Sequence, residues 1–317
     1  MHAAPDNTTR PVRNPYSWTQ AANMVYLDQP IGTGLSKGGS QIKNELGLSS
    51  ELISFLEHFF SVFTELRGAP LWLVGESFGA KYAFYVADAI YARSKATNAR
   101  AGINLRGLAT IDGSLEAGHL TADIPSIGFA TAHAAELRLN ASFVAKVRAE
   151  AKKYKILDYV EKNLVYPPKG PLPIPTVFTN YDIDYTPWQG ESFEPPLSYL
   201  TITYSISSPS ILADISSEAQ DRIGPSFDVY NIAPKYSWYN YTDPLGMPDV
   251  FSRDNYIQNT KGLKAALHAD PSAEYTACTR RRLFQFKVDT SPAPAGALLN
   301  RVLDRNQKTL IQHGLLE

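Results

Sequence analysis

Hydrophobic residues in the first third of the chain follow two alternating patterns. In residues 47–66 they recur every three or four positions, which predicts one amphipathic helix with its apolar face at Leu48, Leu52, Phe55, Leu56, Phe59, Phe60 and Phe63. Short apolar runs predict strands at 23–27, 71–74 and 103–111, and a second helix is expected over 78–94. Strands that alternate with helices favour an α/β fold, with a mostly parallel central sheet flanked by helices.

The regular alternation ends near Gly113, and residues 118–250 have a composition of their own. A helical stretch is predicted over 141–164, and residues 165–210 are crowded with Pro, Tyr and Ser. A helix over 255–268 and a strand over 309–312 then restore the earlier pattern. We therefore expect a core in two parts, residues 1–117 and 251–317, with a largely helical and irregular cap inserted at 118–250 that shapes substrate access.

Charge and composition exclude several classes of protein. The 317 residues include 30 basic and 31 acidic ones, for a net charge of −1. This balance provides no excess of positive charge for binding nucleic acid or an anionic membrane. No apolar run reaches the roughly 18 residues of a membrane span, and residues 1–13 lack the hydrophobic core of a signal peptide. Cys278 is the single cysteine, so an intrachain disulfide and a cysteine-cluster metal site are excluded. We expect no metal and no cofactor.

The strongest candidate for chemistry is Gly75-Glu76-Ser77-Phe78-Gly79, between a predicted strand and a predicted helix. This arrangement is typical of a nucleophile elbow, a strained turn that exposes a serine hydroxyl at the end of a strand. The Phe78 amide would lie at the start of the helix, free to donate to an oxyanion. The alternative interpretation of this pattern is a simple Gly/Ser turn between a strand and a helix, without a catalytic role.

Three acceptor sequons for N-glycosylation begin at Asn7, Asn140 and Asn240. They have a consequence only if the protein enters the secretory route. We therefore keep them as candidate glycosylation sites.

Several stretches together resemble the serine carboxypeptidases of the α/β-hydrolase superfamily. The most specific is the run from Asn14-Pro15-Tyr16-Ser17-Trp18 through Ala21-Ala22-Asn23 to Leu27-Asp28-Gln29-Pro30-Ile31-Gly32-Thr33-Gly34-Leu35-Ser36. The motif around Ser77 matches that family's nucleophile motif, and weaker landmarks follow at 103–107, 227–230 and 263–269. The resemblance covers most of the chain, with the cap matched only loosely.

The resemblance implies a role for each matching residue. Ser77 would be the nucleophile and Phe78 an oxyanion donor, while Glu76, with Gly75 beside it, would bind the C-terminal carboxylate of a peptide substrate. A carboxylic acid can bind a carboxylate only while it holds a proton, so activity should be favoured at acid pH. The resemblance also implies a secreted, vacuolar or lysosomal protein.

Two departures from the family pattern concern the ends of the chain. No glycine-rich oxyanion segment precedes Asn14, and Glu317 falls at the position of the triad acid with no later residue for the base histidine. His268 and His313 do not match the base position. We therefore expect a chain truncated at both ends and nearly inactive as it stands, because a serine without a base is a weak nucleophile.

Three interpretations remain open at this point. The first is a serine carboxypeptidase that releases C-terminal residues through an acyl-enzyme. The second is a related acyltransferase, which would use the same serine to pass an acyl group to an alcohol. The third is a non-catalytic binding protein that keeps the α/β-hydrolase fold.

Overall fold

The computed structural model describes residues 2–3, 11–39, 42–116, 122–170, 173, 211–224, 227, 229, 232, 263–275, 283–284, 289 and 291–314. Contacts divide the chain into a smaller unit, Met1–Ile42 with Pro234–Lys287, and a larger one, Lys43–Ala233 with Val288–Glu317. The division into core and cap given above stays a prediction, because contacts group residues by proximity and not by role.

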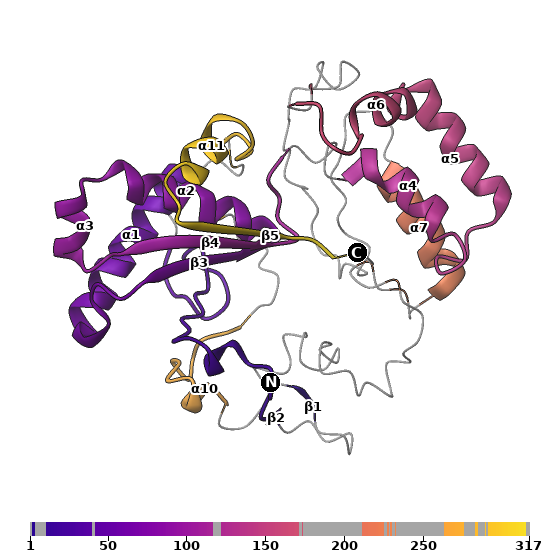
Figure 1. Ribbon diagram of the computed structural model, residues 1–317. Helices are drawn as coiled ribbons and strands as arrows, with labels where there is room; N and C mark the ends of the chain where they lie inside the picture. Colours follow the sequence, from indigo (N-terminus) through magenta and orange to yellow (C-terminus); the bar gives the residue numbers. More distant parts are fainter. Residues whose placement is uncertain are drawn as a thin grey trace. The chain divides into compact units, whose positions relative to one another are not determined.

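The larger unit contains a parallel sheet of three described strands, β3 (Leu71–Glu76), β4 (Leu105–Ile111) and β5 (Lys308–Gln312). Their order is β3-β4-β5, so the central strand pairs with one neighbour from the same region of sequence and one from its far end (Figure 1). Glu76, Ile111 and Gln312 lie in register as the last residues of the three strands. The predicted parallel sheet is confirmed, and these three strands end at one edge.

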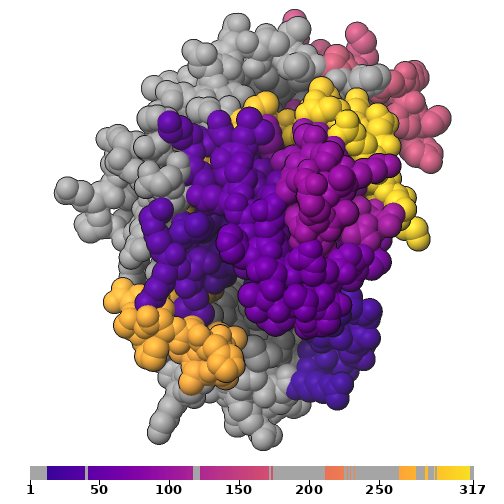
Figure 2. Space-filling model, turned by 90° about the vertical axis from the view of Figure 1, so that its left-hand side faces the viewer, coloured from indigo at the N-terminus to yellow at the C-terminus, as the bar shows by residue number. Residues whose placement is uncertain are grey.

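Helix α2 (Phe78–Ala92) packs against the sheet and contacts both β3 and β4. Helix α1 (Glu45–Val62) and helix α11 (Ala297–Leu303) both contact α2, and the short helix α3 (Lys95–Ala101) contacts α1. A single-turn η2 (Thr64–Leu66) follows α1. The buried core between sheet and helices consists of Ala83, Phe84, Tyr85, Ala87, Leu108, Leu298 and Val302. Figure 2 accordingly shows the yellow C-terminal surface lying against the violet surface of the first half of the chain.

One glycine in the sheet allows a close approach between strands. A Cβ atom at Gly107 would lie 2.2 Å from the Trp72 indole, its register partner on β3. The absence of a side chain at position 107 therefore lets the indole cover the backbone of β4.

Four helices form a second core within the larger unit: α4 (Ile124–Ala132), α5 (Ala141–Lys153), α6 (Ile156–Asn163) and α7 (Ile211–Ile223). Their shared buried residues are Ile124, Ile127, Ala130, Leu137, Leu139, Val147, Ala151, Ile156, Ile211, Ile215, Ala219 and Ile232. The helical stretch predicted over 141–164 is confirmed and consists of two helices, because Lys155 has a φ of 57° and its left-handed conformation separates α5 from α6.

The smaller unit has little regular structure among its described residues. Strands β1 (His2–Ala3) and β2 (Pro11–Val12) pair antiparallel, followed by the single turn η1 (Trp18–Gln20) and, much later, α10 (Leu263–Ala266). The strand predicted over 23–27 is wrong, because no strand of the described part pairs with these residues. Val25 and Tyr26 are 52% and 75% exposed, so water can satisfy the backbone there. Residues 255–262 of the predicted helix lie outside the described residues.

Candidate active site

Ser77 lies in the sharp turn between β3 and α2, with φ 51° and ψ −122°. Such a conformation costs a non-glycine residue about 1–3 kcal/mol and persists only where the surroundings impose it. The Ser77 amide donates to the carbonyl oxygen of Ile111 at 2.9 Å, and the Ser77 carbonyl accepts from the amides of Ala80 at 3.1 Å and Ser114 at 3.0 Å. These three hydrogen bonds hold the turn from both sides while the serine stays exposed.

The two glycines of the motif have different surroundings. A Cβ atom at Gly75 would lie 2.2 Å from the carbonyl oxygen of Gly79, a distance that no real Cβ contact tolerates. A Cβ atom at Gly79 would meet no atom within 4 Å. The close approach therefore requires glycine at position 75, whereas the surroundings of position 79 outside its own helix leave room for a methyl group.

Phe78 is the first residue of α2, a helix of 15 residues. As expected for the first turn of a helix, its amide has no backbone partner among the described residues. The positive end of the helix dipole adds to the attraction of this amide for a negatively charged oxygen. The Phe78 ring packs edge-on against Tyr82, with centroids 5.3 Å apart, and the Lys81 ammonium lies 5.4 Å from its centroid.

Glu76 ends β3 directly before Ser77, and its side chain is exposed. Within the described ranges it forms no ion pair. Its carboxyl group is therefore open to a ligand at the same edge of the sheet as Ser77.

Beside the elbow, the turn after β4 contacts the turn after β5. Asp112, with a φ of 46°, donates its amide to Gln312 and accepts the amide of Gly314 on Oδ1 at 2.5 Å. The Nδ1 atom of His313 lies 3.5 Å from the same Oδ1 atom. The residue directly after each of the three in-register strand ends is Ser77 for β3, Asp112 for β4 and His313 for β5. Sequence reasoning missed Asp112, although an acid directly after a buried strand was a signal.

Glu317, the predicted triad acid, lies outside the described residues, as do Asn7 and Asn240. His268 lies in the smaller unit just after α10, with a φ of 52°. The structure therefore places Gly75, Glu76, Ser77 and Phe78 together and leaves the role of Glu317 a prediction.

The smaller unit contains the run that carries the family resemblance, residues 14–36, and the last part of this run, residues 28–36, folds back on Asp28. The Asp28 carboxylate accepts a hydrogen bond from the Leu35 amide at 2.8 Å. The backbone carbonyl oxygen of Asp28 accepts one from the Ser36 hydroxyl at 2.8 Å. A Cβ atom at Gly34, whose φ is 50°, would lie 2.3 Å from the Asp28 carboxylate. Both the backbone conformation and the available space thus require glycine at position 34.

Asn140 precedes α5 as its N-cap and is exposed. Its Oδ1 atom accepts the Phe143 amide at 2.8 Å and the Ser142 hydroxyl at 2.8 Å. Capping uses the side-chain oxygen, so the side-chain nitrogen that would carry a glycan remains open.

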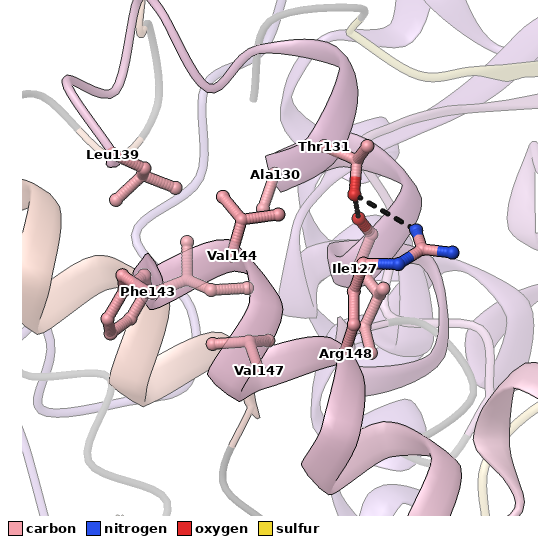
Figure 3. A pocket seen from close by; sticks show the side chains of 9 residues that line it. Ile127, Ala130, Thr131, Leu139, Phe143, Val144, Val147 and Arg148 are labelled. Carbon is pink, nitrogen blue, oxygen red and sulfur yellow. Dashed lines mark hydrogen bonds between the residues drawn. The ribbon is translucent and has the colours of Figure 1, made fainter. Parts of the chain in front are cut away.

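A small hollow lies between helices α4, α5 and α7, and Figure 3 shows its mostly apolar wall. The Arg148 guanidinium approaches the Thr131 hydroxyl at 3.5 Å on its polar side, and this hydroxyl donates to the Ile127 carbonyl at 2.8 Å. The lining residues are Ile127, Ala130, Thr131, Leu139, Phe143, Val144, Val147, Arg148 and Ile215. None of the predicted site residues lines this hollow.

In the part of the chain that the structure describes, no group of three or more His, Cys, Asp or Glu side chains could hold a metal ion. None of the described helices has the length and apolar character needed to cross a membrane.

Comparison with known proteins gives one family model that matches residues 1–316, described as serine carboxypeptidase. A probable serine carboxypeptidase of Arthroderma benhamiae is 26% identical over 98% of this chain and 54% of its own length. A pheromone-processing carboxypeptidase of Aspergillus oryzae is 40% identical over 30% of this chain and 15% of its own. The chain thus spans about half the length of the curated relatives that it matches over most of its residues.

Among solved structures, the crystal structure of Kex1Δp, a prohormone-processing carboxypeptidase of Saccharomyces cerevisiae, matches with a TM-score of 0.56 and 15% identity. The match covers 92% of this chain and 55% of that one. At this identity the likeness shows the fold, and it confirms the predicted α/β-hydrolase architecture.

Proposed function

Because the chain belongs to the serine carboxypeptidase family, we propose that it contributes Ser77 as the nucleophile that hydrolyses the last peptide bond of a peptide or protein substrate. The observation that carries this proposal is the conformation of Ser77, a non-glycine residue at φ 51° between β3 and α2. Strain of this kind is retained where function requires it.

In the proposed reaction the Ser77 hydroxyl attacks the carbonyl carbon of the C-terminal peptide bond. The Phe78 amide donates to the oxyanion that forms, and the C-terminal amino acid leaves with an acyl-enzyme on Ser77. Water then attacks the ester and frees both Ser77 and the shortened peptide. Both steps need a base for proton transfer, a role that family resemblance assigns to no described histidine.

Glu76 is proposed to bind the C-terminal carboxylate of the substrate. Its exposed carboxyl group lies directly before Ser77, at the end of β3 where the scissile bond would be bound. In its protonated form the Glu76 carboxyl group would donate a hydrogen bond to that carboxylate. Glu317 is proposed as the acid that orients the base.

We further propose that the protein enters the secretory route, as a secreted, vacuolar or lysosomal protein. The sequons at Asn7, Asn140 and Asn240 support this proposal, and at Asn140 the acceptor side chain is exposed. Mass analysis of the protein from a secreting host would test it, with a glycan expected on Asn140.

Active-site labelling tests the proposed nucleophile. A fluorophosphonate probe should modify Ser77 in the full-length form of the protein, here called the parent, and leave its Ser77→Ala variant unlabelled. Ser50→Ala, which alters an exposed serine of α1, is the matched control and should label like the parent. An unlabelled parent, or label on a different serine, would contradict the proposal.

A second assay separates hydrolysis from the alternatives. Incubation of the same full-length form with an N-blocked peptide should release free C-terminal amino acids stepwise, and the same peptide with a C-terminal amide should resist. Intact peptide together with acyl transfer to an added alcohol would identify an acyltransferase. A folded parent that neither labels nor transfers would instead be a non-catalytic binding protein.

A further inference from the structure

The first turns of α2 contain a buried positive charge that the proposed chemistry does not use. Lys81 lies one helical turn after Ser77 and is only 5% exposed. A buried ammonium group is costly unless it is paired and hydrogen-bonded. Its Nζ atom lies 2.6 Å from Oδ2 of Asp289 and 2.8 Å from the carbonyl oxygen of Ser291.

Both partners belong to a short segment that also holds α1, here called the strap and comprising residues 289, 291 and 292. The Ser291 hydroxyl accepts the amide of Glu45 at 2.8 Å, which is the first residue of α1. The Pro292 carbonyl accepts the Tyr85 hydroxyl at 2.9 Å. The strap therefore ties the beginning of α1 to the first two turns of α2.

Glu45 adds a second buried carboxyl group beside this ion pair. It is fully buried, and neither of its carboxyl oxygens meets a donor among the described residues. The group within hydrogen-bonding reach is the carboxyl group of Asp289. Two carboxyl groups can share a hydrogen bond only if one of them holds a proton.

The surroundings assign that proton to Glu45. Burial first, and then Asp289 beside it, raises the pKa of Glu45 to about 9. Burial also acts to raise the pKa of Asp289, but the hydrogen bonds from Lys81 and the Ser291 amide outweigh it and lower that pKa. Tyr82 and Tyr85 face the same pair from α2, and burial followed by the two carboxyl groups raises their pKa values. Glu45 thus holds the proton, and Asp289 carries the charge.

Lys81 connects this buried pair to the elbow. Its ammonium lies 5.4 Å from the centroid of the Phe78 ring, whose edge-on partner is Tyr82. An ammonium over an aromatic face is attracted to it, and the attraction grows when water is excluded. This contact restrains the Phe78 ring at the first turn of α2.

We propose that Lys81 is a positioning residue, anchored by Asp289 and the Ser291 carbonyl oxygen, that holds Phe78 and the first turn of α2 in the orientation that an oxyanion donor needs. This inference rests on the proposed function for the role of the Phe78 amide. The anchoring itself is independent of catalysis and can be measured without it.

Hydrogen exchange on the full chain tests the anchoring, read in a peptide covering 78–86 and in a control peptide covering α5. In Lys81→Met, which keeps the length and removes the charge, protection of 78–86 should fall about tenfold while α5 is unchanged, since a charge-assisted hydrogen bond is lost. Lys81→Arg keeps a positive charge and should therefore retain part of the protection of 78–86 that Lys81→Met loses. Unchanged protection, or an equal loss in both peptides, would overturn the proposal.

The Glu45 proton gives a second, pH-dependent test. Between about pH 7 and pH 10 the parent should lose protection in 78–86 as Glu45 ionises. Glu45→Gln keeps a donor towards Asp289 that does not titrate, so its protection should stay constant after correction for the intrinsic exchange rate. Equal losses of protection in parent and variant would show that the Glu45 proton does not help to anchor the first turns of α2.

Labelling of Ser77 then separates this inference from the proposed function. If the parent reacts with the fluorophosphonate probe, Lys81→Met should slow labelling about tenfold, as protection of 78–86 falls. A parent that fails to label refutes the proposed nucleophile, and the exchange experiment still decides whether Lys81 anchors α2. Normal labelling of Lys81→Met despite lost protection would refute the positioning role.

Discussion

A Cβ atom at position 75 would lie 2.2 Å from the Gly79 carbonyl oxygen, whereas one at position 79 would meet nothing within 4 Å. Gly75→Ala should therefore force the elbow apart and destabilise the protein by about 2 kcal/mol, with loss of Ser77 labelling. Gly79→Ala, the matched control in a helix, should change stability by less than about 1 kcal/mol. Urea unfolding of both variants measures the difference, and similar midpoints would contradict the close approach seen at Gly75.

Glu76 gives a prediction about substrate binding. If its exposed carboxyl group binds the substrate carboxylate, Glu76→Ala should slow the release of the C-terminal amino acid from peptides, while labelling of Ser77 stays at the level of the parent. The rate of peptide release measures this, and equal rates for parent and variant would count against the proposed role.

At the scale of single residues, the sequence predicts those parts of the site that lie within a few consecutive positions. Ser77, Phe78 and their flanking residues could be identified because the elbow is contained in five consecutive positions. The partners of Lys81 could not, because they are 208 and 210 residues away in sequence and nothing near Lys81 indicates a buried charge. Asp112 and His313, 3.5 Å apart across two strand ends, are another pair of this kind.

Among the elements, α5 depends on its N-cap, Asn140. The Asn140 side chain accepts the Phe143 amide, so Asn140→Ala should destabilise the helical cluster by about 1 kcal/mol. Asn140→Asp keeps an acceptor oxygen and should unfold close to the parent. A parent-like midpoint for Asn140→Ala in urea unfolding would contradict the cap.

The same position separates capping from glycosylation. Asn140→Asp and Ser142→Ala both destroy the sequon and retain a capping oxygen at position 140. In a secreting host we expect both to lose the Asn140 glycan while keeping near-parent stability. A glycan that persists at this position in Ser142→Ala would contradict the sequon.

Element types were predictable where the pattern was strong and long. Helix α2 and strands β3, β4 and β5 lie within a few residues of their predicted bounds, because their apolar periodicity reflects burial against one another. Helices α4 and α7 were missed, and 23–27 was wrongly assigned as a strand. A short apolar run becomes a strand only when another strand lies beside it, and that partner is not written in the run itself.

For the whole molecule, the buried Glu45 predicts how stability depends on pH. Its pKa is raised from 4.5 to about 9 on folding, so between these values the unfolded chain binds fewer protons than the folded one. This contribution to stability is complete below pH 4.5 and is lost as the pH rises towards 9, with a slope of up to about 1.4 kcal/mol per pH unit. Asp289, with a lowered pKa, acts oppositely at acid pH.

Urea unfolding at several values between about pH 6 and pH 9 measures this slope. The free energy of unfolding of the parent should decline across the range, and that of Glu45→Gln should decline much less. Equal slopes would show that Glu45 does not carry the proton in the folded state.

The strand order has a consequence for synthesis. The ribosome makes β4 well before its second partner, since about 200 residues separate Ile111 from Lys308, and at typical rates of elongation this takes about 10 to 40 seconds. During that interval residues 71–111 can already pair β3 with β4 and form the elbow, while the other side of β4 offers unpaired backbone groups. The nascent chain thus passes through a stage in which its nucleophile turn can be in place and its sheet is still able to accept a foreign strand.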